Sequence, residues 1–151
     1  MNVGMDTYLS GILLVVLFFS AIKDGKEHII PNVYLMRGLA VRILLLLSEV
    51  SLNGTGVLKS FGLKVALCVF IGMLGLLVRA VTGNGIGMGD IKLFMLMFLY
   101  LKVDVWFLSI FMSFILGAIW GIFRMIRGCA DKKFPFAPFM MLGTLTAVVW
   151  L

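Results

Sequence analysis

The feature that most constrains this chain is a series of apolar segments, most of them close to the length that crosses a lipid bilayer. A helix rises about 1.5 Å per residue, so about 20 apolar residues span a hydrocarbon core about 30 Å thick. Six segments can be marked: Tyr8 to Ile22, Ile30 to Leu47, Phe61 to Val81, Ile91 to Leu101, Val105 to Phe123 and Phe136 to Leu151. An apolar segment can cross a bilayer by itself as a helix, because a helix satisfies its own backbone hydrogen bonds. We therefore expect an all-α integral membrane protein, a bundle of about six transmembrane helices that forms a single membrane-embedded domain over residues 1–151.

The composition agrees with a membrane protein and argues against a nucleic-acid-binding one. Hydrophobic residues make up 62% of the chain and charged residues 13%, whereas a soluble domain is roughly 45 to 50% apolar. The net charge of +6 comes from Lys and Arg residues that lie between the apolar segments and form no stripe with interleaved aromatic residues. Such residues are better explained by the orientation of the protein in the membrane, so we expect the bilayer as a partner and no nucleic acid.

The fourth segment is short, and it decides the topology. About 11 residues give a helix of roughly 17 Å, well below the thickness of the bilayer core. This segment could instead fuse with the fifth one across Lys102 and Asp104. Six separate helices with both termini outside would place eight cationic residues on the cytoplasmic side and three on the outer side. The cytoplasmic residues are Lys23, Lys26, Arg79, Lys92, Arg124, Arg127, Lys132 and Lys133, and the outer residues are Lys59, Lys64 and Lys102. Positive residues gather on the cytoplasmic side, so we expect six helices in a prokaryotic cytoplasmic membrane, with Asp24 and Asp90 both at the cytoplasmic face.

Asp24 and Asp90 are the residues most able to carry chemistry. Two carboxylates at one membrane depth can hydrolyse a peptide bond without a metal or a nucleophile, since one acts as base on a water and the other as acid. Two carboxylates held close together cannot both ionise at low cost, so such a pair holds one shared proton near neutrality. The simpler interpretation is that Asp24 is a solvated helix end and that Asp90 complements the dipole at the start of its helix.

The sequence around Asp90 favours a functional role. Glycines alternate with other residues from Gly83 to Gly89, directly before the acid. Glycine removes side chains and widens the allowed backbone, so this stretch is either a flexible loop or a place where a substrate backbone approaches the acid. The two cysteines form no CxxC pair, and we expect no metal site and no cofactor.

Three motifs give the chain a specific resemblance. Gly87-Met88-Gly89-Asp90-Ile91-Lys92-Leu93 is similar to the GxGDxKL signature of the type IV prepilin peptidases, a family of membrane aspartic proteases. Asp24 is followed by Ile30, Pro31 and Asn32, which resemble that family's I-P-N triplet after its first catalytic Asp. The segment that contains Pro135 and Pro138 resembles the family's P-F-G-P-F element, with Ala137 in place of the usual Gly.

The resemblance implies that Asp24 and Asp90 are the catalytic pair of a six-helix peptidase. It implies Gly87, Gly89, Lys92, Pro31, Asn32, Pro135 and Pro138 as supporting residues. The substrate would be a prepilin or pseudopilin precursor, cut at the cytoplasmic membrane face. Many relatives also methylate the new N-terminus and carry paired CxxC motifs, which this sequence does not contain, so we expect cleavage without methylation.

Other interpretations remain open from the sequence. The protein could be a non-catalytic membrane transporter or assembly protein whose two acids bind a cation or proton, or an inactive relative that binds a leader without cutting it. Lys92 could reach the membrane interface or influence the neighbouring acid. Arg37 and Arg42 lie within the second segment, where they could pair with Glu49 or contact lipid phosphate.

Overall fold

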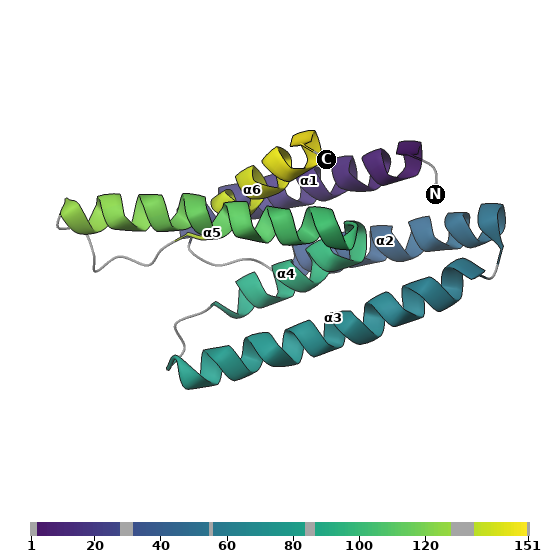
Figure 1. Ribbon diagram of the computed structural model, residues 1–151, viewed down its shortest axis with the longest axis horizontal. Coiled ribbons are helices and arrows are strands. Elements are labelled where there is room, and N and C mark those ends of the chain that lie inside the picture. Colours follow the sequence, from purple (N-terminus) through teal and green to yellow (C-terminus); the bar gives the residue numbers. More distant parts are fainter. Residues whose placement is uncertain (1–2, 28–31, 55, 84–86, 128–134, 151) are drawn as a thin grey trace. The chain divides into compact units, whose positions relative to one another are not determined.

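The computed structural model describes residues 3–27, 32–54, 56–83, 87–127 and 135–150, and within them the chain forms six α-helices and no strands. In chain order, the helices are α1 (Val3–Glu27), α2 (Asn32–Asn53), α3 (Gly56–Val81), α4 (Met88–Tyr100), α5 (Val103–Ile126) and α6 (Ala137–Trp150), as Figure 1 shows. The predicted all-α fold with six helices is therefore confirmed. By length and composition, α3, α5 and residues 6–25 of α1 are able to cross a membrane.

The fourth and fifth apolar segments are separate helices. Helix α4 ends at Tyr100, and Lys102 has an extended backbone with φ −66° and ψ 154°. Its carbonyl then accepts a hydrogen bond of 2.8 Å from the N–H of Trp106, which starts α5. The alternative in which the two segments fuse is therefore wrong, because the backbone leaves the helical conformation between them.

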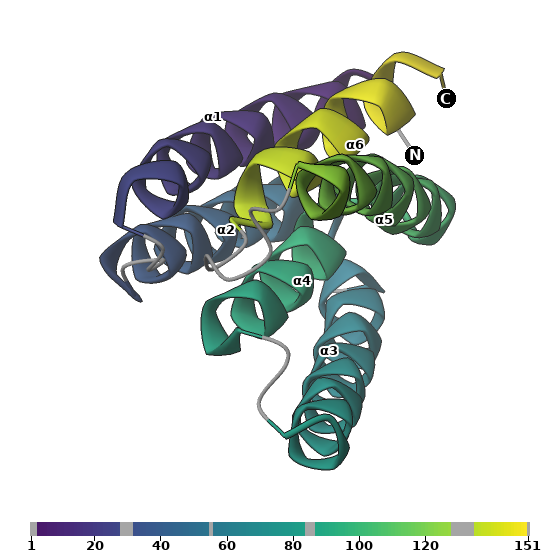
Figure 2. The same cartoon turned by 90° about the vertical axis from the view of Figure 1, so that its left-hand side faces the viewer.

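The helices group into two compact units. Unit 1 consists of residues 1–31 and 101–151 and contains α1, α5 and α6. Within it, α6 packs against both α1 and α5, an arrangement that Figure 2 shows. Unit 2 consists of residues 32–100, in which α2, α3 and α4 each contact the other two. The prediction of a single domain over residues 1–151 stays a prediction.

Small residues bring the helices of unit 1 close together. Gly143 of α6 faces Ser109 and Ser113 of α5, and a Cβ atom on this glycine would lie 2.6 Å from the Ser109 carbonyl oxygen and 2.7 Å from the Ser113 nitrogen. Both serine side chains are fully buried and hydrogen-bond to carbonyls of their own helix. Small residues at a helix interface allow two backbones to approach closely, which is how apolar helices associate without help from water.

Unit 2 uses glycines in the same way to hold its short helix. Gly72 and Gly75 of α3 face Met95 and Ile91 of α4, and added Cβ atoms would lie 2.7 Å from the Met95 sulfur and 2.9 Å from Ile91 Cγ2. Helix α4 is largely buried from Ile91 onward. The element that carries Asp90 is thus packed against a longer helix rather than exposed along its length.

Candidate active site

Asp24 lies near the end of α1 and is only 6% exposed. Its Oδ2 atom accepts a hydrogen bond of 3.0 Å from the backbone N–H of Ala137, the first residue of α6. The first N–H groups of a helix have no partner within the helix, and a carboxylate there also complements the positive end of the helix dipole. Unit 1 therefore joins the first candidate acid to the third sequence motif, and Asp24 is a buried group rather than a solvated helix end.

The proline-containing motif forms the start of α6. Pro138 occupies the first turn, where its missing N–H removes no helical hydrogen bond, and the carbonyl of Phe136 accepts bonds from Phe139 and Met140. The ring of Phe136 lies 5.4 Å from that of Phe114, a residue of α5. Pro135 directly precedes this turn. The motif thus fixes the N–H groups of α6 next to Asp24.

Asp90 is the third residue of α4 and is partly exposed. A Cβ atom on Gly87 would lie 2.8 Å from Asp90 Oδ2, while the Gly87 carbonyl accepts a 3.3 Å hydrogen bond from the N–H of Ile91. The carboxylate therefore turns back over the start of its own helix, into space that exists because residue 87 has no side chain. Gly89 lies within the first turn, and residues 84–86 of the glycine-rich stretch lie outside the described residues.

Lys92 connects the motif around Asp90, at the start of α4, to the motif at the start of α2. Its ammonium donates a hydrogen bond of 2.9 Å to Oδ1 of Asn32, the first residue of α2. Two residues predicted as supporting, and separated by 60 positions, thus meet. Pro31, which precedes Asn32, lies outside the described residues.

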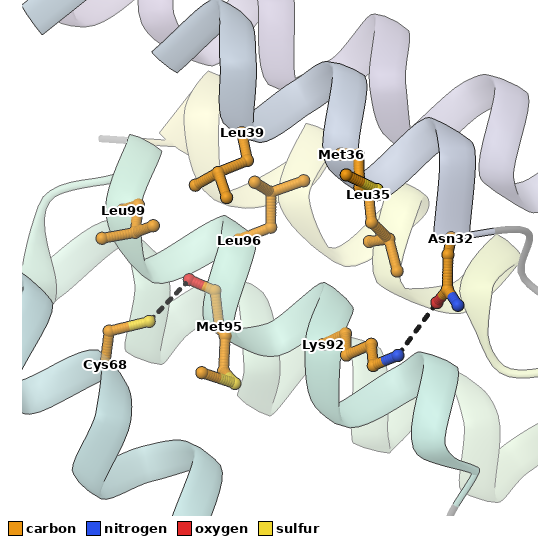
Figure 3. A pocket seen from close by; sticks show the side chains of 9 residues that line it. All are labelled: Asn32, Leu35, Met36, Leu39, Cys68, Lys92, Met95, Leu96 and Leu99. Carbon is orange, nitrogen blue, oxygen red and sulfur yellow. Dashed lines mark hydrogen bonds between the residues drawn. The ribbon is translucent and has the colours of Figure 1, made fainter. Parts of the chain in front are cut away.

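A pocket of about 390 Å³ opens beside this hydrogen bond. Figure 3 shows the Asn32–Lys92 bond at one end of the pocket and Cys68 and Leu99 toward the other. Apart from Asn32, Lys92 and Cys68, its lining is apolar and consists of Leu35, Met36, Leu39, Met95, Leu96 and Leu99. The polar pair therefore marks the end of an apolar surface that runs along α4 from the turn that carries Asp90.

The two candidate acids belong to different units, Asp24 to unit 1 and Asp90 to unit 2. Their action as a pair on one water stays a prediction. Among the described residues, no group of three or more His, Cys, Asp and Glu side chains is arranged to hold a metal ion. The contact between Asp24 and Ala137 could not be predicted from the sequence, in which the order of the motifs was the only signal for it.

A comparison with known protein families identifies a relationship that covers most of the chain. The model of the type IV leader peptidase family matches residues 11–122. Among curated proteins, the prepilin leader peptidase/N-methyltransferase of Bacillus subtilis (strain 168) is 33% identical over 75 residues, a stretch that covers 48% of this chain and 30% of that protein. No solved structure gives a significant match. Because the family match extends over well more than half of the sequence, the chain belongs to the type IV leader peptidase family.

Proposed function

We propose that this protein is a membrane aspartic endopeptidase that removes the leader peptide of prepilin or pseudopilin precursors at the cytoplasmic face of the membrane. Asp24 and Asp90 are its catalytic pair in this proposal. The observation that carries it is the environment of Asp24, whose buried carboxylate is held by the N-terminus of α6 through the family-like proline motif. An acid that served only as a solvated helix end would have no need of either the burial or the backbone partner.

The chemistry divides between the two acids. Asp24 would act as the base, because the N–H of Ala137 and the N-terminal dipole of α6 both stabilise a negative charge on its carboxylate. It takes a proton from a water molecule as the water oxygen attacks the carbonyl carbon of the scissile bond. Asp90 would hold a proton and give it to the leaving amine as the C–N bond breaks. The result is a leader with a new carboxyl terminus and a mature protein with a new amino terminus.

Substitution by asparagine tests the pair with little risk to the fold. An Asn at position 24 still offers an amide oxygen to the Ala137 N–H, so Asp24→Asn keeps the hydrogen bond and removes the ionisable group. We expect Asp24→Asn and Asp90→Asn to abolish cleavage of a co-expressed precursor, measured by precursor size and by the N-terminal sequence of the product. Asp104→Asn is the matched control, because Asp104 also lies in the first turn of a helix but is exposed.

The outcomes separate the candidate functions. If either Asn variant still cuts the precursor, the aspartic dyad is wrong. If the unsubstituted protein leaves every precursor of its genome uncut, while both acids are required for a proton- or cation-dependent phenotype, the transporter or assembly function takes its place.

The proposal also holds that the reaction stops at cleavage. The two cysteines of the sequence form no paired CxxC motif, the element that the resemblance associates with methylation. The mass of the mature N-terminal peptide shows directly whether the new N-terminus carries a methyl group. An added methyl group that depends on this protein would contradict cleavage without methylation.

A further inference from the structure

Helix α4 carries Asp90, yet its length does not fix its depth in a membrane. Its 13 residues give a helix of roughly 20 Å, against a bilayer core of about 30 Å. A helix that matches the bilayer thickness is held at its depth by its own apolar length and by its flanking polar residues. A shorter helix has to be held by side chains of its neighbours instead.

Arg42 supplies such a contact at the last turn of α4. This residue lies in the middle of α2 and is only 4% exposed. Its Nε atom donates a hydrogen bond of 2.9 Å to the carbonyl of Leu99, and its Nη1 atom donates one of 2.8 Å to Oε1 of Glu49. The carbonyls of the last turn have no partner within their own helix, and a cation there is favoured by the helix dipole.

Aromatic contacts strengthen the same junction. The guanidinium of Arg42 lies 5.1 Å from the ring centre of Phe61 and 6.0 Å from that of Tyr100. The hydroxyl of Tyr100 donates a hydrogen bond of 2.6 Å to the carbonyl of Gly38, on α2. Two hydrogen bonds therefore hold the end of α4 against α2, one donated by a side chain of α2 to the backbone of α4 and one donated by a side chain of α4 to the backbone of α2.

We infer that Arg42, held in place by Glu49, is a positioning residue that fixes α4 along its axis and thereby fixes Asp90 relative to α2. The inference rests on the proposed function for its effect on cleavage. Leu99, whose carbonyl binds Arg42, lies nine positions after Asp90. The contact and the acid are therefore roughly 14 Å apart along one continuous helix. A slip of one residue would move Asp90 by about 1.5 Å and turn it by about 100°. Catalytic groups tolerate displacements of only about 0.5 Å.

An ordinary stabilising ion pair is the competing explanation, and it makes a different prediction. Apolar residues of similar volume often replace a buried ion pair with little loss of stability. Such apolar residues cannot donate a hydrogen bond to the Leu99 carbonyl, however. Replacing both members of the pair therefore tests the position of α4 with little change in the stability of the protein. Removing one partner alone is less informative, because it leaves the other charge buried without its partner.

The first experiment replaces both residues, as Arg42→Met/Glu49→Leu. We expect a folded protein in detergent, a kcat for precursor cleavage about 10- to 100-fold lower, and a KM that changes less than about 3-fold, because the reacting groups are misplaced while substrate binding is kept. Arg37→Met is the matched control: it removes the same charge from the same helix at an exposed position and leaves kcat unchanged. If the double variant does not fold, Arg42→Lys decides, because it keeps a cation for Glu49 without the guanidinium fork and should lower kcat with KM again unchanged.

A cross-link measures the position of α4 without any activity. Asn32→Cys and Lys92→Cys place thiols where the two side chains meet, in a protein that also carries Cys68→Ala and Cys129→Ala. A short thiol cross-linker should join them efficiently when Arg42 and Glu49 are present and poorly in the double variant. Unchanged cross-linking and unchanged kcat would overturn the inference. Reduced cross-linking in a protein that never cuts a precursor would leave the inference standing and overturn the proposed function instead.

Discussion

At the scale of single residues, Asp24 combines a structural role with the proposed catalytic one. Its carboxylate binds the Ala137 N–H across 113 positions of sequence. Local patterns in the sequence predict the acid and the proline motif separately. They do not predict the contact between the two, because no rule of spacing connects the end of the first helix to the start of the last.

Asp24→Ala should therefore affect stability as well as cleavage. Loss of a buried cap costs about 1 to 2 kcal/mol, so we expect the free energy of unfolding of Asp24→Ala to fall by that amount, as followed by urea denaturation in mixed micelles. Asp24→Asn keeps the acceptor and should stay close to the unsubstituted protein. Equal destabilisation by both variants would show that charge, rather than the hydrogen bond, holds the start of α6.

Gly87 makes a second residue-scale prediction, because its hydrogen occupies the place next to the Asp90 carboxylate. A methyl group on residue 87 would lie 2.8 Å from Asp90 Oδ2, so that side chain has to rotate away. We expect Gly87→Ala to reduce kcat at least 10-fold with a small change in stability. Gly62→Ala is the control, because nothing lies within 4 Å of the added atom. Equal kcat values for the two variants would contradict this role of Gly87.

At the scale of the elements, hydropathy predicted the cores of the helices better than their ends. The second segment was predicted over Ile30 to Leu47, whereas α2 runs over Asn32–Asn53. The added turns contain Ser48 and Glu49, polar residues that an apolar pattern excludes. Glu49 lies within the helix and forms an ion pair with Arg42. The sequence left open whether Arg42 pairs with Glu49 or with a lipid phosphate. The partner of a buried charge depends on the tertiary contact, which no local pattern contains.

The close contact between α5 and α6 predicts an effect of substitution at the scale of the elements. A Cβ atom on Gly143 meets backbone atoms of α5, which cannot rotate away as a side chain can. We expect Gly143→Ala to lower the free energy of unfolding by about 1 to 3 kcal/mol. Gly121→Ala, within α5, has open space around the added atom and should leave stability unchanged or slightly raised. The comparison of the two denaturation midpoints checks this, and similar midpoints would mean that the two helices can move apart.

At the scale of the whole molecule, the six helices found in the described part of the chain could be predicted from the sequence, because each apolar segment is bounded by charged or glycine-rich residues. The side of the membrane on which each loop lies stays a prediction. The length and composition of the long helices bear only on whether they can cross a membrane: 11% of the spanning stretch of α3 is buried within the protein, as expected where lipid covers the remainder.

Cysteine labelling of intact cells tests that topology, with each cysteine placed in a protein that lacks Cys68 and Cys129. With both termini outside and six crossings, Ser51→Cys and Asp104→Cys lie on the outer side, and Thr82→Cys and Arg127→Cys lie on the cytoplasmic side. All four positions are exposed. A thiol reagent that does not cross membranes should therefore label the first two in intact cells and the other two after the cells are permeabilised.

If the short α4 enters and leaves on one side, Asp104→Cys and Arg127→Cys exchange their behaviour, while Ser51→Cys and Thr82→Cys do not. That result would also place Ala137 on the outer side while Asp24 stays on the cytoplasmic side, and it would therefore contradict the hydrogen bond that joins these two residues.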